Sequence, residues 1–141
     1  MIVLDTNVVS ELMRARPDSA VVAWLDAQQS DDLHLTAVTA AELFFGVARI
    51  PAGSRKTSIT SAIADMLEHD FTDRILPFDT FAAIDYGQLV AHREQLGHPI
   101  GMADGMIAAT ALSAGASCLA TRNTKDFGET GLALVNPWTA S

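Results

Sequence analysis

Short apolar runs alternate with longer helical patterns along this chain, and this alternation is the feature that most constrains its fold. Four runs rich in leucine or β-branched residues have the length of buried strands, and a possible fifth follows near the end. They cover residues 1–4, 33–36, 75–78, 117–120 and 132–135. Strands that alternate with helices predict right-handed crossovers and a parallel sheet with helices on both faces. We therefore predict an α/β fold, a three-layer α/β/α sandwich with a mostly parallel sheet of four or five strands.

The segments between the predicted strands carry helix signals. Three helices are expected to follow the start signals Asp18, Ser54 and Asp79. Their segments are VVAWLDA, KTSITSAIADML and TFAAIDYGQLVAHREQLG, in that order. The alanine-rich segment MADGMIAATALSAG is apolar on most faces, which predicts a buried helix that ends at Gly115. The Pro/Gly/Ser-rich stretch IPAGSRK is short enough to be a loop between helices. Residues 1–141 are therefore predicted to form a single domain.

Composition narrows the possible location and function. No uncharged apolar run approaches the roughly 20 residues that a membrane-spanning helix needs, and no basic leader precedes the first apolar run. Cys118 is the single cysteine, which rules out an internal disulfide and favours a small buried thiol in a reducing cytoplasm. The net charge of −8 argues against diffuse attraction to nucleic acid. It does not exclude a nuclease, because acids that hold metal also make a protein acidic.

Acidic residues recur where the predicted strands end. Asp5 directly follows the first strand, Glu42 is expected in the first turn after the second, Asp104 opens the alanine-rich helix, and Asp126 lies in the loop TRNTKDF after the fourth. Open parallel sheets bind ligands beyond the carboxyl ends of their strands, so these four acids can share one pocket. Clustered carboxylates repel one another unless a cation holds them ionised, and oxygen ligands suit Mg²⁺ or Mn²⁺. Such a site predicts phosphodiester hydrolysis.

Other polar residues flank these acids. Thr6 and Asn7, next to Asp5, offer a hydroxyl and an amide that could orient a metal-bound water or a carboxylate. Arg122 and Lys125 are solvated surface residues by default, but their place beside the predicted site lets them meet phosphates.

Each acid also has a purely structural interpretation. Asp5 and Asp126 could cap helices or start turns, as aspartate often does. Glu42 could complete a capping box by reaching back to the backbone N–H of Thr39. Asp104 resists such an interpretation best, because it lies among apolar residues where an unpaired carboxylate is costly to bury.

Four segments that together span essentially the whole chain are MIVLDTNVVSEL, TAVTAAELFFGV, IGMADGMIAATAL and LATRNTKDF. In this order they resemble the PIN-domain ribonucleases of the VapC toxin family. The final Asn136, Pro137 and Trp138 are similar to a hallmark of the FitB-type branch of that family.

The resemblance implies a PIN-domain fold and a Mg²⁺- or Mn²⁺-dependent endoribonuclease toxin. It also implies a cognate antitoxin that carries a DNA-binding segment, a homodimer, and the possibility of a larger toxin–antitoxin assembly. The core acids carried over by position are Asp5, Glu42 and Asp104. Family members differ at the fourth position, which we assign to Asp126, with Asn123 as a neutral helper.

Two other functions fit part of the pattern. A phosphatase would also place an aspartate after the first strand, but Asp5 lacks the second acid two residues on that such enzymes usually carry. An inactive PIN domain that mainly shapes the DNA binding of its antitoxin shares every feature except turnover. The apolar stripe Leu43, Phe44, Val47 and Ile50 is expected in the core, although a groove of this kind could take an amphipathic antitoxin helix.

Overall fold

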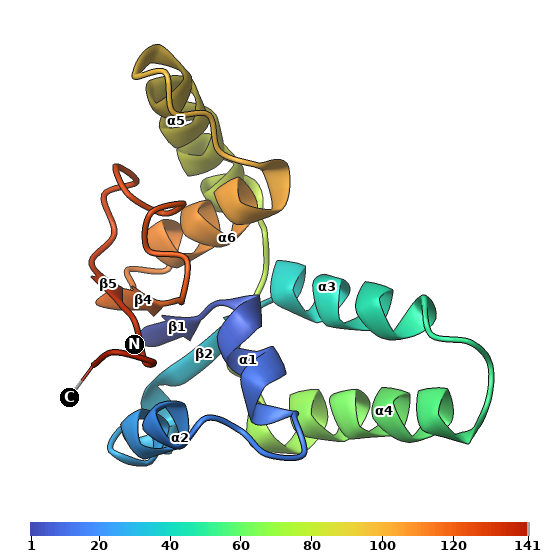
Figure 1. The fold of residues 1–141 in the computed structure, drawn as a ribbon. Helices are drawn as coiled ribbons and strands as arrows, with labels where there is room; N and C mark the ends of the chain where they lie inside the picture. Colours follow the sequence, from blue (N-terminus) through green and yellow to red (C-terminus); the bar gives the residue numbers. More distant parts are fainter. Residues whose placement is uncertain (141) are drawn as a thin grey trace.

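A five-stranded parallel sheet forms the centre of the computed structural model, which describes residues 1–140 (Figure 1). Its strand order is β3-β2-β1-β4-β5, and every neighbouring pair is parallel. The strands are β1 (Ile2–Leu4), β2 (Leu33–Thr36), β3 (Ile75–Leu76), β4 (Cys118–Ala120) and β5 (Leu134–Val135). All five predicted strands are present, although the third and fifth are shorter than predicted. The carboxyl ends of β2, β1 and β4 lie along one edge of the sheet.

Helices connect the strands as the sequence predicts. They are α1 (Thr6–Leu12), α2 (Ser19–Asp26), α3 (Ala37–Ala48), α4 (Ser54–Asp65), α5 (Thr80–Gln95) and α6 (Met102–Ser113), with a 3₁₀ turn at Ser30–Asp32 and a π-helical turn at Met66–Asp70. Asp18 and Asp79 cap α2 and α5 by accepting backbone N–H groups, as predicted. Ser54 is the first residue of α4 rather than its cap, because Gly53 occupies that position.

Both faces of the sheet are buried, which confirms the three-layer arrangement. On one face, Leu4 belongs to a core cluster that includes residues from α1, α2, α3 and α4. On the other face, Val3 belongs to a second cluster built with α5 and α6. Successive strand residues point to opposite faces, so two neighbouring residues serve two cores. Because neither face meets water, β1 is apolar throughout rather than alternating.

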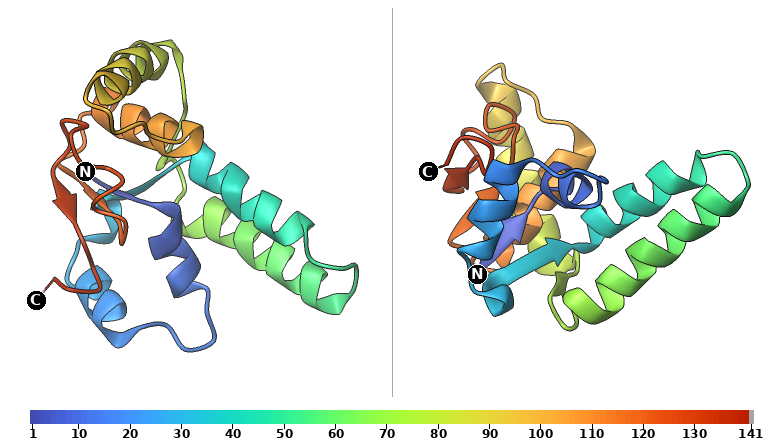
Figure 2. Two further views of the ribbon diagram at one scale, coloured as in Figure 1. Left: turned by 45° about the horizontal axis from the view of Figure 1, so that its top comes forward. Right: turned by 60° about the horizontal axis from the view of Figure 1, so that its bottom comes forward.

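The pair α3 and α4 extends beyond the sheet as an antiparallel hairpin (Figures 1 and 2). Residues 49–53 join the two helices at the tip of the hairpin, so the predicted loop over residues 50–56 is present but shorter, because α4 already begins at Ser54. Leu43 and Val47 face the core, as expected for the apolar stripe, while Ile50 is half-buried and Phe44 is exposed. The stripe therefore contributes to the core and also reaches the surface between the two helices.

Helix α6 lies against α5 and the sheet, and the alanine and isoleucine residues of its interior are buried. Gly105 makes this close packing possible, because a Cβ there would lie 3.0 Å from the ring of Tyr86 on α5. Gly115 follows the helix with a φ of +74°, which confirms the predicted glycine stop.

The Cys118 thiol is only half-buried, so the prediction of a buried thiol was wrong. Cys118 is the first residue of β4, where the strand emerges from the core. Partial burial still raises the pKa of the Cys118 thiol. Among residues 1–140, no helix is both long enough and apolar enough to cross a membrane.

Candidate active site

Asp5 is held at the carboxyl end of β1 by two hydrogen bonds. Its Oδ1 accepts the backbone N–H of Thr6 at 2.8 Å, so Asp5 also caps α1. Its Oδ2 accepts the hydroxyl of Thr121 at 2.8 Å, from the residue that follows β4. The Asp5 side chain is only 4% exposed. The capping interpretation of Asp5 is therefore correct, and it is compatible with a site role because the carboxylate also lines a cavity.

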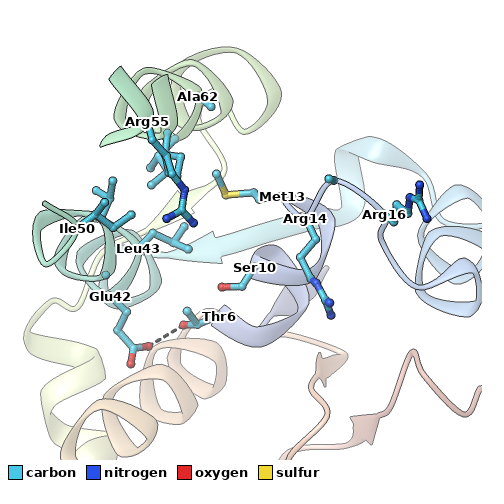
Figure 3. Close-up of a pocket in the computed structure, with 15 residues that line it drawn as sticks. Thr6, Ser10, Met13, Arg14, Arg16, Glu42, Leu43, Ile50, Arg55 and Ala62 are labelled. Carbon is cyan, nitrogen blue, oxygen red and sulfur yellow. Dashed lines mark hydrogen bonds between the residues drawn. The ribbon is translucent and has the colours of Figure 1, made fainter. Parts of the chain in front are cut away.

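Glu42 reaches across to α1 instead of capping its own helix. The Thr6 hydroxyl donates to Glu42 Oε1 at 2.6 Å (Figure 3). The backbone N–H of Thr39 donates to the hydroxyl of Thr36, the cap of α3, so the capping-box interpretation was wrong. Glu42 also lies in the second turn of α3 rather than in the first turn, because the helix begins at Ala37.

Three threonine hydroxyls form a directed chain that ends at Glu42. Each hydroxyl has one proton, and that of Thr6 is used on Glu42, so Thr39 must donate in its 3.0 Å contact with Thr6. The hydroxyl of Thr36 in turn donates to Thr39 at 3.4 Å. Thr36 and Thr39 are fully buried, so water does not compete for the hydrogen bonds between their hydroxyls.

One cavity of about 470 Å³ brings Asp5, Glu42 and Asp104 together. The remaining lining residues are Thr6, Asn7, Ser10, Glu11, Arg14, Arg122, Asn123 and Trp138. Asp104 lies in the first turn of α6, as predicted, and is half-buried. The three acids come from β1, α3 and α6, so only the folded chain assembles the cavity.

Burial and mutual repulsion weaken the acids of this cavity. Burial raises the pKa of Asp5 to about 6, against the stabilising hydrogen bonds from Thr121 and Thr6, and the charges of Asp104 and Glu42 add to the increase. The pKa of Asp104 is also raised, first by burial and then by the charges of Glu42 and Asp126. Carboxylates in such surroundings gain from a bound cation.

The loop after β4 separates Asn123 from Asp126. Asn123 lines the cavity, whereas Asp126 is exposed and does not, although its charge reaches Asp104. Within residues 1–140, the Asp126 carboxylate accepts no hydrogen bond, so it does not stabilise its own loop in the way a turn residue would. Lys125 is exposed and lies outside the lining. Asn7 accepts the backbone N–H of Arg122 at 3.4 Å and so ties α1 to this loop.

Sequence reasoning missed the buried Arg93, which anchors the same loop. Its guanidinium donates to the backbone carbonyls of His98, Asp126 and Gly128 at 2.6 to 2.8 Å. Thr121, Glu11 and Trp138 were also missed as residues around the cavity. Thr121 directly follows β4, and Thr36 is the last residue of β2, so a search for polar residues at the ends of predicted strands would have found both.

An apolar groove of about 740 Å³ opens beside the cavity (Figure 3). It runs between α1, α3 and α4 and shares Thr6, Ser10, Arg14 and Glu42 with the cavity. Its apolar lining includes Met13, Leu43, Val47, Ile50, Ile59 and Ile63. Arg55 reaches from α4 into this space, as Figure 3 shows. A ligand lying in the groove would therefore end beside the carboxylates.

The donor chemistry of the cavity fits a hard divalent cation. Asp5, Glu42 and Asp104 offer only oxygen atoms, which Mg²⁺ and Mn²⁺ prefer. Burial first, and then the neighbouring carboxylates, raise the pKa of Asp5 and of Asp104, and a cation would oppose both effects. Within residues 1–140, no three acidic, histidine or cysteine side chains already lie close enough together to enclose an ion.

Comparison with known proteins places the whole chain among relatives of one family. The PIN domain family model matches residues 2–131. The VapC ribonuclease Y4jK of Sinorhizobium fredii is 49% identical over 138 residues, with 98% of each chain covered. Toxin FitB of Neisseria gonorrhoeae is 42% identical over 138 residues, with 98% of this chain and 99% of the relative covered. A solved structure of FitAB bound to an IR36 DNA fragment matches with a TM-score of 0.92 and 40% identity, covering 100% of this chain and 98% of that chain.

Proposed function

Because this chain belongs to the PIN-domain family, we propose that it is a metal-dependent endoribonuclease, the toxin of a toxin–antitoxin pair that acts in the cytoplasm. The observation that carries the proposal is the convergence of Asp5, Glu42 and Asp104 on one cavity at the carboxyl ends of the strands. The names of the VapC and FitB relatives support the reaction class and the toxin role.

In this proposal, Asp5, Glu42 and Asp104 hold Mg²⁺ or Mn²⁺. When bound, such an ion lowers the pKa of a water molecule and polarises a phosphoryl oxygen. Thr121 fixes the Asp5 carboxylate, and Thr6 fixes that of Glu42, so the protein orients its acids through hydrogen bonds before substrate arrives.

The residues around the three acids are proposed to contact the RNA or to bind a second ion. Asn7, Arg122 and Asn123 line the cavity, and we assign them to contacts with the phosphate or ribose of a bound strand. Asp126 adds negative charge from outside the lining, and we assign it to a weaker, second ion. Asn123 is then the neutral helper inside the cavity.

Metal removal tests the proposal directly. Purified protein should cleave RNA with Mg²⁺ or Mn²⁺ and lose that activity in excess EDTA, because three carboxylates alone repel a phosphodiester. Glu42→Gln keeps an acceptor for Thr6 but supplies a weaker ligand, so activity should fall by about 10- to 100-fold. Asp31→Asn removes the same charge from an exposed site outside the cavity and is the matched control. Equal cleavage with and without EDTA would contradict the proposal.

The antitoxin is proposed to occupy the apolar groove. An amphipathic segment would bury its apolar side on α3 and α4 and present an arginine to the carboxylates, which suit bidentate capture of a guanidinium. The similarity to FitAB, solved in complex with DNA, supports a partner that carries a DNA-binding segment. The same observation favours the second candidate function, an inactive PIN domain that acts mainly in transcriptional regulation, and the EDTA experiment separates the two.

A second apolar surface supports the proposed homodimer. Phe45 and Met102 are 64% and 69% exposed. Phe45 and Met102 line one hollow of about 770 Å³ that also includes Glu42, so an interface there would lie beside the cavity. We propose that a second copy of the chain covers this surface.

Charge placed on this surface should separate the two copies. The double variant Phe45→Glu, Met102→Glu is expected to raise the dimer dissociation constant at least about 100-fold, because an interface would bury both charges. Sedimentation velocity across a range of protein concentrations measures the change, and Phe45→Leu is the apolar control. A monomeric wild-type protein would refute the dimer.

A further inference from the structure

Arg122 lies at the rim of the carboxylate cavity with its guanidinium held against the ring of Trp138. The central guanidinium carbon, Cζ, is 5.0 Å from the centre of the ring, and both residues line the cavity. Strands β4 and β5 are parallel neighbours, with Ala120 opposite Val135. The residues that follow each strand therefore leave the sheet side by side, which brings Arg122 and Trp138 together.

The local backbone fixes Trp138. Its N–H donates to Asn136 Oδ1 at 2.9 Å, and the N–H groups of Thr139 and Ala140 donate to the carbonyl of Asn136. Pro137 is buried, and the half-buried Trp138 side chain packs against the core cluster that contains Leu4. The fold therefore holds the indole in place, with its ring beside the guanidinium of Arg122.

Arg122 keeps its charge free for a ligand. Two cationic side chains line the cavity, and one of them, Arg14, pairs with the buried Glu11 at 3.2 Å. Within residues 1–140, the guanidinium of Arg122 forms no ion pair. Its side chain is exposed, and only its backbone N–H is used, on Asn7.

We propose that Arg122 forms a phosphate subsite for RNA and that Trp138 is the positioning residue that holds it. This inference rests on the proposed ribonuclease function and adds a subsite next to the acids. A strand that approaches three carboxylates needs a cation nearby, and a planar guanidinium can grip a phosphate with two N–H groups. The indole face holds the guanidinium in place without neutralising it.

Replacing either Arg122 or Trp138 should raise the KM for RNA. For cleavage of a mixed-sequence RNA oligonucleotide, Arg122→Gln is expected to raise KM about tenfold through the loss of one charged phosphate contact. Trp138→Leu should raise KM about two- to fivefold, the typical effect of an exposed cation–π contact. The double variant should be no worse than Arg122→Gln, because Trp138 acts through Arg122. Trp138→Phe keeps an aromatic face and should largely restore KM.

Salt dependence supplies a readout that a merely structural role would not change. Loss of one phosphate contact should reduce the slope of log KM against log salt by about 0.7 in Arg122→Gln. Trp24→Leu is the matched control, because Trp24 is the other tryptophan, is also half-buried against the same core cluster and lies outside the cavity. It is expected to affect stability without a change in KM.

Several outcomes would overturn the inference. They are an unchanged KM in Trp138→Leu, effects of the two substitutions that add independently, or Arg122→Gln weakening only antitoxin binding. If the wild-type protein cleaves no RNA, the proposed function fails separately. Binding of the labelled oligonucleotide in Ca²⁺, measured by fluorescence anisotropy, then tests whether the same variants weaken RNA affinity in the same order. Equal affinities of the wild-type protein and the variants would refute the subsite.

Discussion

Asp5→Asn is expected to reduce RNA cleavage at least about 1,000-fold, because a lost metal ligand costs several kcal/mol of transition-state stabilisation. The same substitution should make the metal-free protein more stable at neutral pH. Asp5 is 4% exposed, and its pKa is raised to about 6, so its charge is unfavourable in the folded state without a cation. The neutral amide keeps an oxygen for the Thr6 N–H, and the Thr121 hydroxyl can turn to accept from the new amide.

The pH dependence of this effect follows from the direction of the shift. The folded protein binds the Asp5 proton more tightly than the unfolded chain, whose aspartates titrate near a pKa of about 3.9. The contribution of Asp5 to the free energy of unfolding is therefore fully present below pH of about 4. It falls as the pH rises through the folded pKa of about 6 and is constant above that range. The penalty at neutral pH is about 3 kcal/mol at most, from a shift of about two pKa units.

Urea unfolding in EDTA at two pH values tests this prediction. At pH 7.5, Asp5→Asn should be about 1 to 3 kcal/mol more stable than the wild-type protein, and near pH 4 the difference should vanish. Asp31→Asn, in an exposed position, should show no such gain. A less stable Asp5→Asn protein at pH 7.5 would mean that the carboxylate serves the fold rather than a metal.

Expression of the chain without its partner should arrest bacterial growth, and the Asp5→Asn form should not, if toxicity arises from cleavage. Co-expression of the antitoxin should restore growth. The groove offers a way to break this rescue alone, because Gly46 lines it and a Cβ at this position meets nothing within 4 Å. Gly46→Leu would fill the groove while favouring the helix, so this variant should stay toxic even with antitoxin present.

Gly87→Leu is the matched control for the groove variant. Gly87 is also exposed, lies inside a helix, and has open space where a Cβ would lie, but it is not part of the groove lining. Its substitution should leave both toxicity and rescue intact. Colony counts on inducing plates measure all four forms of the chain, each with and without the antitoxin. Equal toxicity of the wild-type and Asp5→Asn chains would point to a mechanism other than catalysis.

The strands and several helix ends were predictable because their signals are local. Buried parallel strands appear as short apolar runs, and Asp18 and Asp79 cap helices through neighbours two or three residues away. Gly115 ends α6 for an equally local reason, its positive φ. The edge strands β3 and β5 were predicted too long, because apolar residues beside a short strand carry the same pattern.

The candidate site was predictable only in part. The strand-end rule predicted that Asp5, Glu42 and Asp104 could share a pocket, and the three now line one cavity, while their role as metal ligands stays a prediction. The capping-box pattern at Glu42 was misleading, because Thr36 supplies the cap from one residue before the helix and leaves Glu42 free to reach Thr6. No local pattern could reveal such a contact between α1 and α3.

Contacts between residues far apart in the sequence could not be predicted for the same reason. Arg93 carries no sequence signal of its own, yet it is buried because three backbone carbonyls from outside its helix surround it. Trp138 belongs to a family hallmark, but its contact with Arg122 depends on the pairing of β4 with β5. Such contacts depend on tertiary arrangement rather than on residue type.

The position of β1 at the centre of the sheet affects how the chain acquires activity during synthesis. Asp5 and the hydroxyl of Thr121 are 116 residues apart in sequence, and β1 cannot pair with β4 until that interval has been translated. Contacts of such long range slow folding. Until β4 and Thr121 have been translated, the nascent chain therefore lacks one wall of its cavity, and under the proposed function it cannot yet cleave RNA. Under the same proposal, the cell would have that interval to supply the antitoxin.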